Sequence, residues 1–138
     1  MGLSPSPARA LDFLDALDDD GARPTVTSRR HMALLARQVG AGPAITLRTD
    51  AGALAMIMGL WPAETHREAW FAPGPALRAE LREVLRWSAF FLAGREPLVT
   101  YVAPHRVAVG RVARRCGFQA RGEIETALGP LVEWRRDA

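Results

Sequence analysis

Apolar residues recur at two spacings along this chain, and each spacing predicts a type of secondary structure. Residues 5–17 carry an apolar side chain at every third position from Ala8 to Leu17, which predicts a helix. Ser6 is a suitable cap for this helix, and Pro7 suits its first turn. The acidic and glycine-containing stretch "DDDGARP" should end it.

A second helix is expected over residues 28–40. Thr27 or Ser28 can cap its first turn, and Gly40 can end it. Its apolar face would consist of Met32, Leu35 and Val39. Residues 44–61 then predict a β-hairpin, in which "TDAGA" is the turn between two strands.

The two strands of this hairpin are Ala44–Arg48 and Leu54–Trp61. The second is apolar almost throughout, so it should be central in the sheet and covered on both faces. A polar connection and a short third strand, Ala69–Ala72, follow it. The clearest helical pattern of the chain comes next, over Ala76–Ala93. The apolar stripe of that helix consists of Leu77, Leu81, Val84, Leu85, Ser88, Phe91 and Leu92.

The C-terminal part predicts a strand at Leu98–Val102, a helix in "HRVAVGRVARRCG", and two strands, "FQARGEIET" and "LVEWRR", around the turn "ALGP". The helix should direct Val109, Val112 and Cys116 inward. The expected order is therefore α-α-β-β-β-α-β-α-β-β. This order predicts one α/β or α+β domain, residues 1–138, with a mixed sheet flanked by helices and with residues 1–27 as an N-terminal helix and connection.

The composition argues against a nucleic-acid-binding, a secreted or a membrane-spanning protein. The 138 residues carry a net charge of +3, and every basic residue other than histidine is arginine. So small a charge, with acidic residues interspersed, does not favour a nucleic-acid partner. Cys116 is the single cysteine, which fits a reducing cytoplasm. The chain has neither an apolar run long enough to span a membrane nor the pattern of a secretory signal.

The stretch "GRVARRCGFQARGE" combines a helix end with a strand start. Gly117 can adopt the left-handed conformation that ends a helix, and Phe118 can then enter the core. Packing alone accounts for such a Gly-Phe step. Its position, after a strand and a helix and before a C-terminal hairpin, adds further information.

In this context the chain resembles the GNAT superfamily of N-acetyltransferases. The likeness in element order covers about residues 28–134, and its sequence-specific part is "RVARRCGF" with the helix and strand before it. Within the superfamily the chain looks most like short phage-associated members, which share an apolar strand ending in Gly-x-x-Pro, here "AMIMGLWP", and a helix ending in Gly-Phe.

The resemblance implies a splayed pair of parallel strands, here Ala69–Ala72 and Leu98–Val102, which would bind the pantetheine arm of acetyl-CoA. The pyrophosphate would lie on the loop that opens the following helix, where free amides and the helix dipole favour an anion. The residues expected to contact the cofactor are Phe71, Ala72, Gly74, Ala76, Leu77, Arg78 and Arg106. Acetyl-CoA is the implied cosubstrate, and no metal is expected.

Three departures weaken the implied chemistry. The loop "APGPALRAE" has one glycine and two prolines where the superfamily has a richer glycine pattern, and each proline removes an amide donor. The tyrosine that the superfamily uses four residues before the helix-ending glycine is replaced by Ala113. The asparagine that opens the same helix is replaced by Arg106.

Acetyl transfer needs a base for the amine and an acid for the leaving thiolate. Glu64 and Glu68 lie just before the third strand, where the superfamily often has its base. His105 lies at the mouth of the splay and could be the acid or a phosphate contact. Ordinary surface positions are the alternative for all three. Tyr101, the single tyrosine, is interpreted as a packing residue.

An arginine-rich nucleic-acid binder is the least favoured class, and two other functions lead. One is a cytoplasmic N-acetyltransferase that moves an acetyl group from acetyl-CoA to an amine by direct attack on the thioester. The other is a non-catalytic protein of the same fold that acts as an interaction or assembly factor in a phage or prophage. The missing tyrosine and the proline-containing loop favour the second. The acceptor amine is not specified by the sequence, and a homodimer is compatible with it.

Overall fold

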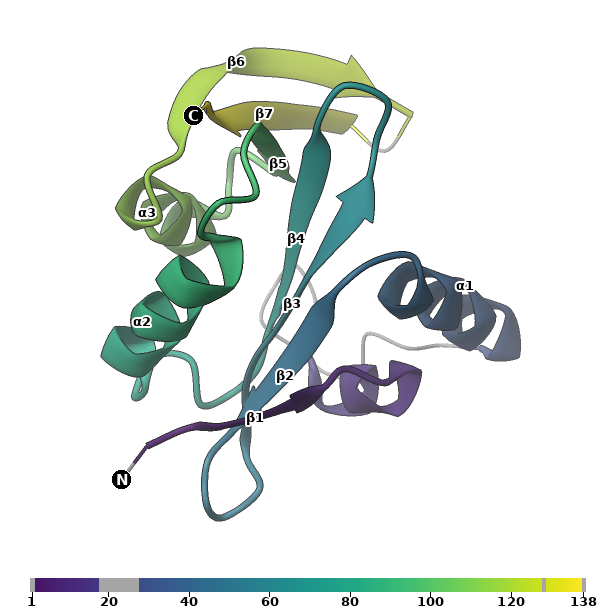
Figure 1. The fold of residues 1–138 in the computed structure, drawn as a ribbon. Helices are drawn as coiled ribbons and strands as arrows, with labels where there is room; N and C mark the ends of the chain where they lie inside the picture. Colours follow the sequence, from purple (N-terminus) through teal and green to yellow (C-terminus); the bar gives the residue numbers. More distant parts are fainter. Residues whose placement is uncertain (1, 18–27, 128, 138) are drawn as a thin grey trace.

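The apolar run Leu54–Trp61 lies within the third strand of a seven-stranded sheet (Figure 1). The computed structural model describes residues 2–17, 28–127 and 129–137. Within these ranges the strands are β1 Ser4–Pro7, β2 Ala44–Arg48, β3 Leu54–Pro62, β4 Arg67–Pro73, β5 Leu98–Val102, β6 Gln119–Thr126 and β7 Gly129–Arg136. They are arranged in the order β1-β2-β3-β4-β5-β7-β6, and every neighbouring pair is antiparallel except β4 and β5.

Helices cover both faces of this sheet (Figure 1). The described helices are the 3-10 helix η1 Ala10–Asp15 and the α-helices α1 Arg29–Gly40, α2 Leu81–Leu92 and α3 Val107–Arg115. One hydrophobic cluster lies under α2 and α3, and a smaller one lies under η1 and α1. The mixed α/β architecture expected from the sequence is therefore confirmed. None of the described helices is both long and apolar enough to cross a bilayer.

The central hairpin agrees closely with the prediction. β2 has the expected bounds, and β3 is buried from Leu54 to Leu60 because both hydrophobic clusters pack against it. β5 also has its expected bounds. At the start of α1, the hydroxyl oxygen of Ser28 accepts a hydrogen bond from the amide of His31, so Ser28 is the cap. Thr27, the other candidate cap, lies outside the described residues.

The prediction of an N-terminal helix over residues 5–17 is wrong. Ser4–Pro7 instead pairs with β2 as an edge strand, where prolines are tolerated because one side of the strand needs no donors. The tighter η1 then buries Phe13 and leaves Leu11 and Leu14 exposed. Neither Ser6 nor Pro7 therefore caps or opens a helix.

The predicted start of the helix at Ala76 is also wrong, because α2 begins at Leu81. The amides of Gly74 and Ala76 donate to the carbonyls of Ala55 and Leu54, which holds this segment against β3. Residues 75–80 form successive turns before regular helix geometry begins. The remainder of the helix lies on the sheet as expected.

The Gly-Phe step at the end of α3 is confirmed. Gly117 has φ +91°, and Phe118 is 2% exposed in the cluster under α2 and α3. The amide of Phe118 donates to the carbonyl of Ala113, and the amide of Gly117 donates to that of Arg114, so the last carbonyls of α3 are satisfied. Cys116 is buried beside them.

A candidate active-site cleft between β4 and β5

The parallel strands β4 and β5 are hydrogen-bonded only at their beginnings. Their register contains two pairs, Arg67 with Leu98 and Glu68 with Val99. Both strands continue beyond these pairs, to Pro73 and Val102, without a ladder between them. The expected splay between neighbouring parallel strands is therefore present.

The direction of the backbone groups in β4 follows from strand alternation. The amide of Arg67 donates to the carbonyl of Pro97, so it points toward β5. Every second residue of a strand points its N–H and C=O in the same direction, which turns those of Phe71 toward the splay. Ala72 is one residue out of phase, and its backbone groups face β3, where Ile57 is its register partner.

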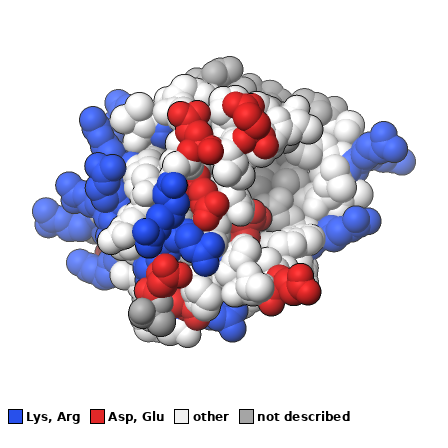
Figure 2. All heavy atoms as spheres, turned by 90° about the horizontal axis from the view of Figure 1, so that it is seen from above, with Lys and Arg blue, Asp and Glu red and all other residues white. Residues whose placement is uncertain are grey.

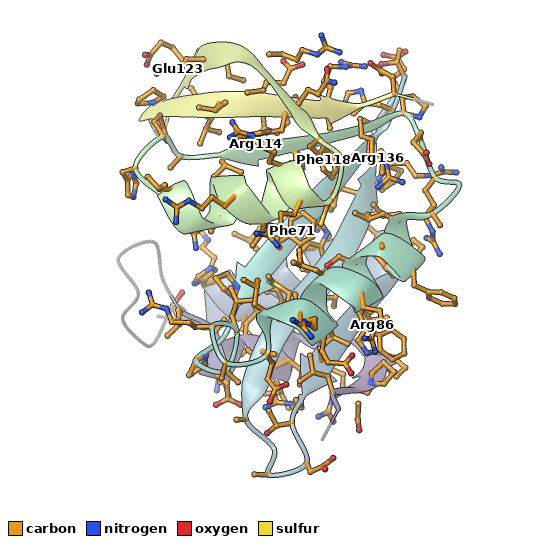
Figure 3. All side chains as sticks on the ribbon, turned by 90° about the vertical axis from the view of Figure 1, so that its left-hand side faces the viewer. Phe71, Arg86, Arg114, Phe118, Glu123 and Arg136 are labelled. Atoms are coloured by element: carbon orange, nitrogen blue, oxygen red, sulfur yellow. The ribbon has the colours of Figure 1, made fainter. Side chains whose placement is uncertain are left out.

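The splay opens into a cavity of about 230 Å³. Its lining consists of Glu68, Ala69, Trp70, Phe71, Thr100, Tyr101, Val102, Ala103, Arg106, Val109 and Leu131. Phe71 projects from the sheet toward the helical layer (Figure 3). Seen from above, the surface is hollowed on the side of α1, and arginines gather on the opposite side, where α3 lies (Figure 2).

Glu68 and Tyr101 lie on the same face of the sheet. Glu68 is two residues from Trp70, whose indole packs against Phe13 under η1 and α1. Tyr101 alternates with Val102, which belongs to the cluster on the opposite face. Both polar side chains therefore lie on the α1 side of the cleft, while α2 and α3 cover the other side.

The protonation of these two groups is shifted by their surroundings. Burial raises the pKa of the Glu68 carboxyl, and the nearby His66 opposes this only in part. Burial also raises the pKa of Tyr101, with further increases from the carboxylates of Glu133 and Glu68. A carboxyl with raised affinity for protons can act as a base near neutral pH, and a tyrosine with a raised pKa stays protonated there.

Neither the family models nor the curated protein sequences gave a match to this chain. Solved structures do match it. An N-acetyltransferase from Staphylococcus aureus Mu50 has 13% identity and a TM-score of 0.69, covering 99% of each chain. A phosphinothricin acetyltransferase of the GNAT superfamily from Sinorhizobium meliloti, solved with AcCoA, has 16% identity and a TM-score of 0.61, covering 99% of this chain and 88% of that one. The chain has the GNAT acetyltransferase fold.

A third structure of this fold, a mutant of the spermidine N-acetyltransferase from Vibrio cholerae, has 11% identity and a TM-score of 0.64 and covers 97% of this chain and 92% of that one. At these identities the likeness concerns the fold. The chemistry of this chain must therefore be argued from its own residues, and two regions matter most: the loop after β4 and the helix α3.

The loop after β4 has few free donors for a GNAT-type pyrophosphate site. Pro75 lies in it, and Pro73, the last residue of β4, comes directly before it. The amides of Gly74 and Ala76 donate to β3, and the amide of Leu77 donates to the carbonyl of Gly74. Among the described residues, the amides of Arg78 and Ala79 form no hydrogen bond, and the exposed side chain of Arg78 forms no ion pair. The amides of Arg78 and Ala79 and the guanidinium of Arg78 are therefore the donors that this loop leaves available.

The position of the usual GNAT tyrosine lies inside the core. Ala113 is 2% exposed and lines a void of only about 10 Å³ with Met56 and Phe71. A tyrosine side chain would not fit there without repacking. The acid for a leaving thiolate would have to come from another element of this chain.

The structure brings some of the predicted site residues to the cavity and leaves others outside it. Glu68, Phe71 and Arg106 line it. Glu64 is exposed in the turn between β3 and β4, and His105 is exposed before α3, and neither belongs to the lining. Among the described residues, no three His, Cys, Asp or Glu side chains come together as a metal site requires.

Tyr101 is the lining residue that the sequence interpretation missed. An aromatic residue on a strand between Thr100 and Val102 is expected to pack in the core. That expectation left its hydroxyl group out of the candidate site residues. The available signal was its position: it is the only tyrosine of the chain, and it lies on the strand that borders the predicted splay.

Proposed function

We propose that this protein is an acetyl-CoA-dependent N-acetyltransferase that acts in the cytoplasm. The observation that carries the proposal is the cleft between β4 and β5. It begins where the ladder ends at Glu68 and Val99, and it contains a carboxyl and a phenol whose pKa values are both raised. Perturbed titratable groups that converge in a cleft are typical of catalytic sites.

The cofactor would bind along the splay. The N–H and C=O of Phe71 face the gap, so the pantetheine arm can pair with them like an added strand. At the loop, the free amides of Arg78 and Ala79 and the guanidinium of Arg78 would hold the pyrophosphate. Arg106 lines the cavity just before α3 and supplies a further positive charge for the cofactor.

The reaction needs no metal. The nitrogen of the acceptor amine attacks the thioester carbon, a C–N bond forms, and the C–S bond breaks. The Glu68 carboxylate, directly or through a water molecule, takes the proton that the nitrogen loses. The Tyr101 hydroxyl, which stays protonated at neutral pH, gives a proton to the leaving thiolate. Acetylated amine and free CoA are the products.

A non-catalytic function in a phage or prophage is the second candidate. Two observations favour it: Ala113 stands in place of the usual tyrosine, and three amides of the loop are used within the protein. On this alternative the fold would serve as a docking module, and the cleft would bind neither cofactor nor amine.

Calorimetric titration with acetyl-CoA distinguishes the two candidates. We expect micromolar or weaker binding, because so few donors face the pyrophosphate. Arg78→Ala should weaken binding about tenfold to a hundredfold, as expected for the loss of a charge-assisted contact. Arg82→Ala is the matched control, since Arg82 is an exposed arginine on α2 that forms no ion pair in the described chain.

Each result of the titration supports or excludes one of the two candidate functions or the proposed pyrophosphate site. No heat at millimolar acetyl-CoA would remove the enzyme and leave the docking module. Tight binding that Arg78→Ala does not change would place the pyrophosphate elsewhere. If binding is confirmed, the release of free thiol with a panel of primary amines tests the transfer itself, and Tyr101→Phe should slow that release without weakening acetyl-CoA binding.

A further inference from the structure

A second cavity lies on the other side of the loop between β5 and α3. Its volume is about 250 Å³, and it runs between α3 and β7. Its lining consists of Val102, Ala103, Pro104, Arg106, Val107, Gly110, Arg111, Arg114, Val132 and Trp134. It shares Val102, Ala103 and Arg106 with the cleft described above, and none of the proposed catalytic groups lines it.

A buried donor without an acceptor lies in this groove. Trp134 is 7% exposed, and its indole nitrogen Nε1 is buried with no hydrogen-bond partner. A side chain on Gly110 would stand 3.3 Å from the Cζ2 atom of that indole. Cζ2 and Nε1 are both attached to Cε2, so the N–H lies next to the part of the ring that faces Gly110. A buried N–H is normally satisfied, and its lack of an acceptor indicates a place for one.

The charged side chains of the groove are all arginines. The guanidinium carbon of Arg114 lies 5.6 Å from the centre of the Trp134 ring, and Arg114 extends from α3 toward β7 (Figure 3). Arg111 lies one turn earlier on the same helix. No carboxylate is found in the described lining, and neither of these two arginines forms an ion pair with another described residue.

We propose that the groove between α3 and β7 is a binding site for a small anion with an apolar, preferably aromatic, body. The apolar floor of Val102, Val107 and Val132 would take the body. Arg111 and Arg114 would hold a phosphate or carboxylate through forked, charge-assisted hydrogen bonds, and the indole N–H would complete them. This site does not depend on acetyl transfer, because neither Glu68, Tyr101 nor the loop after β4 lines it.

The test is a calorimetric titration of the full chain with phenyl phosphate, phenol and inorganic phosphate. Phenyl phosphate should bind. Phenol and inorganic phosphate should each bind at least tenfold more weakly, because phenol lacks the phosphate group and inorganic phosphate lacks the aromatic ring. Arg114→Ala should weaken phenyl phosphate binding about tenfold to a hundredfold. Arg115→Ala is the matched control, because Arg115 is an exposed neighbour on α3 that does not line the groove.

Gly110→Ala provides a second and gentler variant. Its methyl group would stand 3.3 Å from the indole Cζ2 and narrow the groove there, whereas an alanine inside a helix is favourable for folding. It should lower the affinity for phenyl phosphate at least tenfold, keep the thermal midpoint, and leave acetyl-CoA binding as in the wild type. The proposal is overturned if Arg115→Ala weakens binding as much as Arg114→Ala, if Gly110→Ala has no effect on it, or if inorganic phosphate binds as well as phenyl phosphate.

Discussion

The guanidinium of Arg136, near the end of β7, donates to the main-chain carbonyl of Cys116 over 3.0 Å. The same side chain donates to the carbonyl of Leu92 over 3.3 Å and forms an ion pair of 3.4 Å with Glu96. These two carbonyls lie at the C-terminal ends of α3 and α2. One cation therefore ties both helices of this face to the sheet, at the ends where a positive charge is favourable.

Arg136→Ala should destabilise the fold by about 1–3 kcal/mol, because two half-buried carbonyls lose a charge-assisted donor. Urea unfolding followed by circular dichroism measures the change. Arg135→Ala is the control: Arg135 forms ion pairs of 3.5 Å with Glu133 and 3.7 Å with Asp137, and surface pairs of this kind contribute less than about 1 kcal/mol. Equal effects of the two substitutions would contradict the tying role of Arg136.

Gly117→Ala should destabilise the protein by about 1 kcal/mol or more. Its φ of +91° is costly for any residue with a Cβ, and the added atom would lie 3.2 Å from Cδ of Arg136. Gly40→Ala, at the end of α1, is the comparison, because that position has open space and no positive φ. It should be neutral or slightly stabilising. A thermal midpoint that Gly117→Ala leaves unchanged would argue against the strain.

The sequence predicts those parts of the fold in which local pattern and tertiary packing agree. The apolar run of β3 requires burial on both faces, and the Gly-Phe step after α3 requires a helix end, so both were predictable. The N-terminal segment was not, because its leucines have helical spacing. Pairing of Ser4–Pro7 with the free edge of β2 outweighs that local preference for a helix. The sequence near Ser4–Pro7 does not indicate that its partner strand lies about forty residues away.

The location of the candidate site in the fold was predictable from the sequence. The chemical groups that line it were harder to predict. Element order predicted Glu68 just before the third strand, and the structure places it inside that strand, as the second residue of β4. The use of the amides of Gly74 and Ala76 by β3 depends on a contact between distant segments, which composition does not reveal. The place of Tyr101 in the cavity lining was hidden for a similar reason, since that cavity depends on where β4 and β5 separate.

Asp12 should make stability depend on acid pH. Its buried carboxylate accepts hydrogen bonds from the hydroxyl of Thr46 at 2.7 Å, the amide of Arg9 at 2.9 Å and the guanidinium of Arg48 at 3.1 Å. Burial raises its pKa, but these donors outweigh burial and hold the pKa below the usual 3.8. The folded state thus binds the proton more weakly than the unfolded state, so this stabilisation is complete above pH 3.8 and is lost as the pH falls through the lowered pKa.

Asp12→Asn should therefore cost about 1–3 kcal/mol at neutral pH and reduce the loss of stability on acidification. Urea unfolding at pH 7 and at pH 3 measures both effects. Asp15→Asn provides the control, because that half-exposed carboxylate makes a single 3.0 Å ion pair with Arg48 and should change stability by less than about 1 kcal/mol. An Asp12→Asn variant as stable as the wild type at pH 7 would show that the network contributes nothing.

Glu68 behaves in the opposite way to Asp12. Burial at the cleft raises its pKa, so the folded state binds the proton more tightly than the unfolded state. Its charged form is therefore a cost to folding, which appears as the pH rises through the raised pKa and is absent at lower pH. A group that is kept at such a cost and lines a cavity is a candidate for a functional role.

Glu68→Gln separates that role from structure, because the two readouts should move in opposite directions. The variant removes the buried charge, so at pH 8 it should be at least as stable as the wild type in urea unfolding. Transfer of acetyl to an amine, followed by thiol release, should fall about a hundredfold or more with the loss of the base, and the rise of the wild-type rate with pH through the Glu68 pKa should disappear. Glu64→Gln, on the exposed turn outside the cavity, should change neither quantity. A Glu68→Gln variant that keeps both its rate and its pH profile would exclude Glu68 as the base.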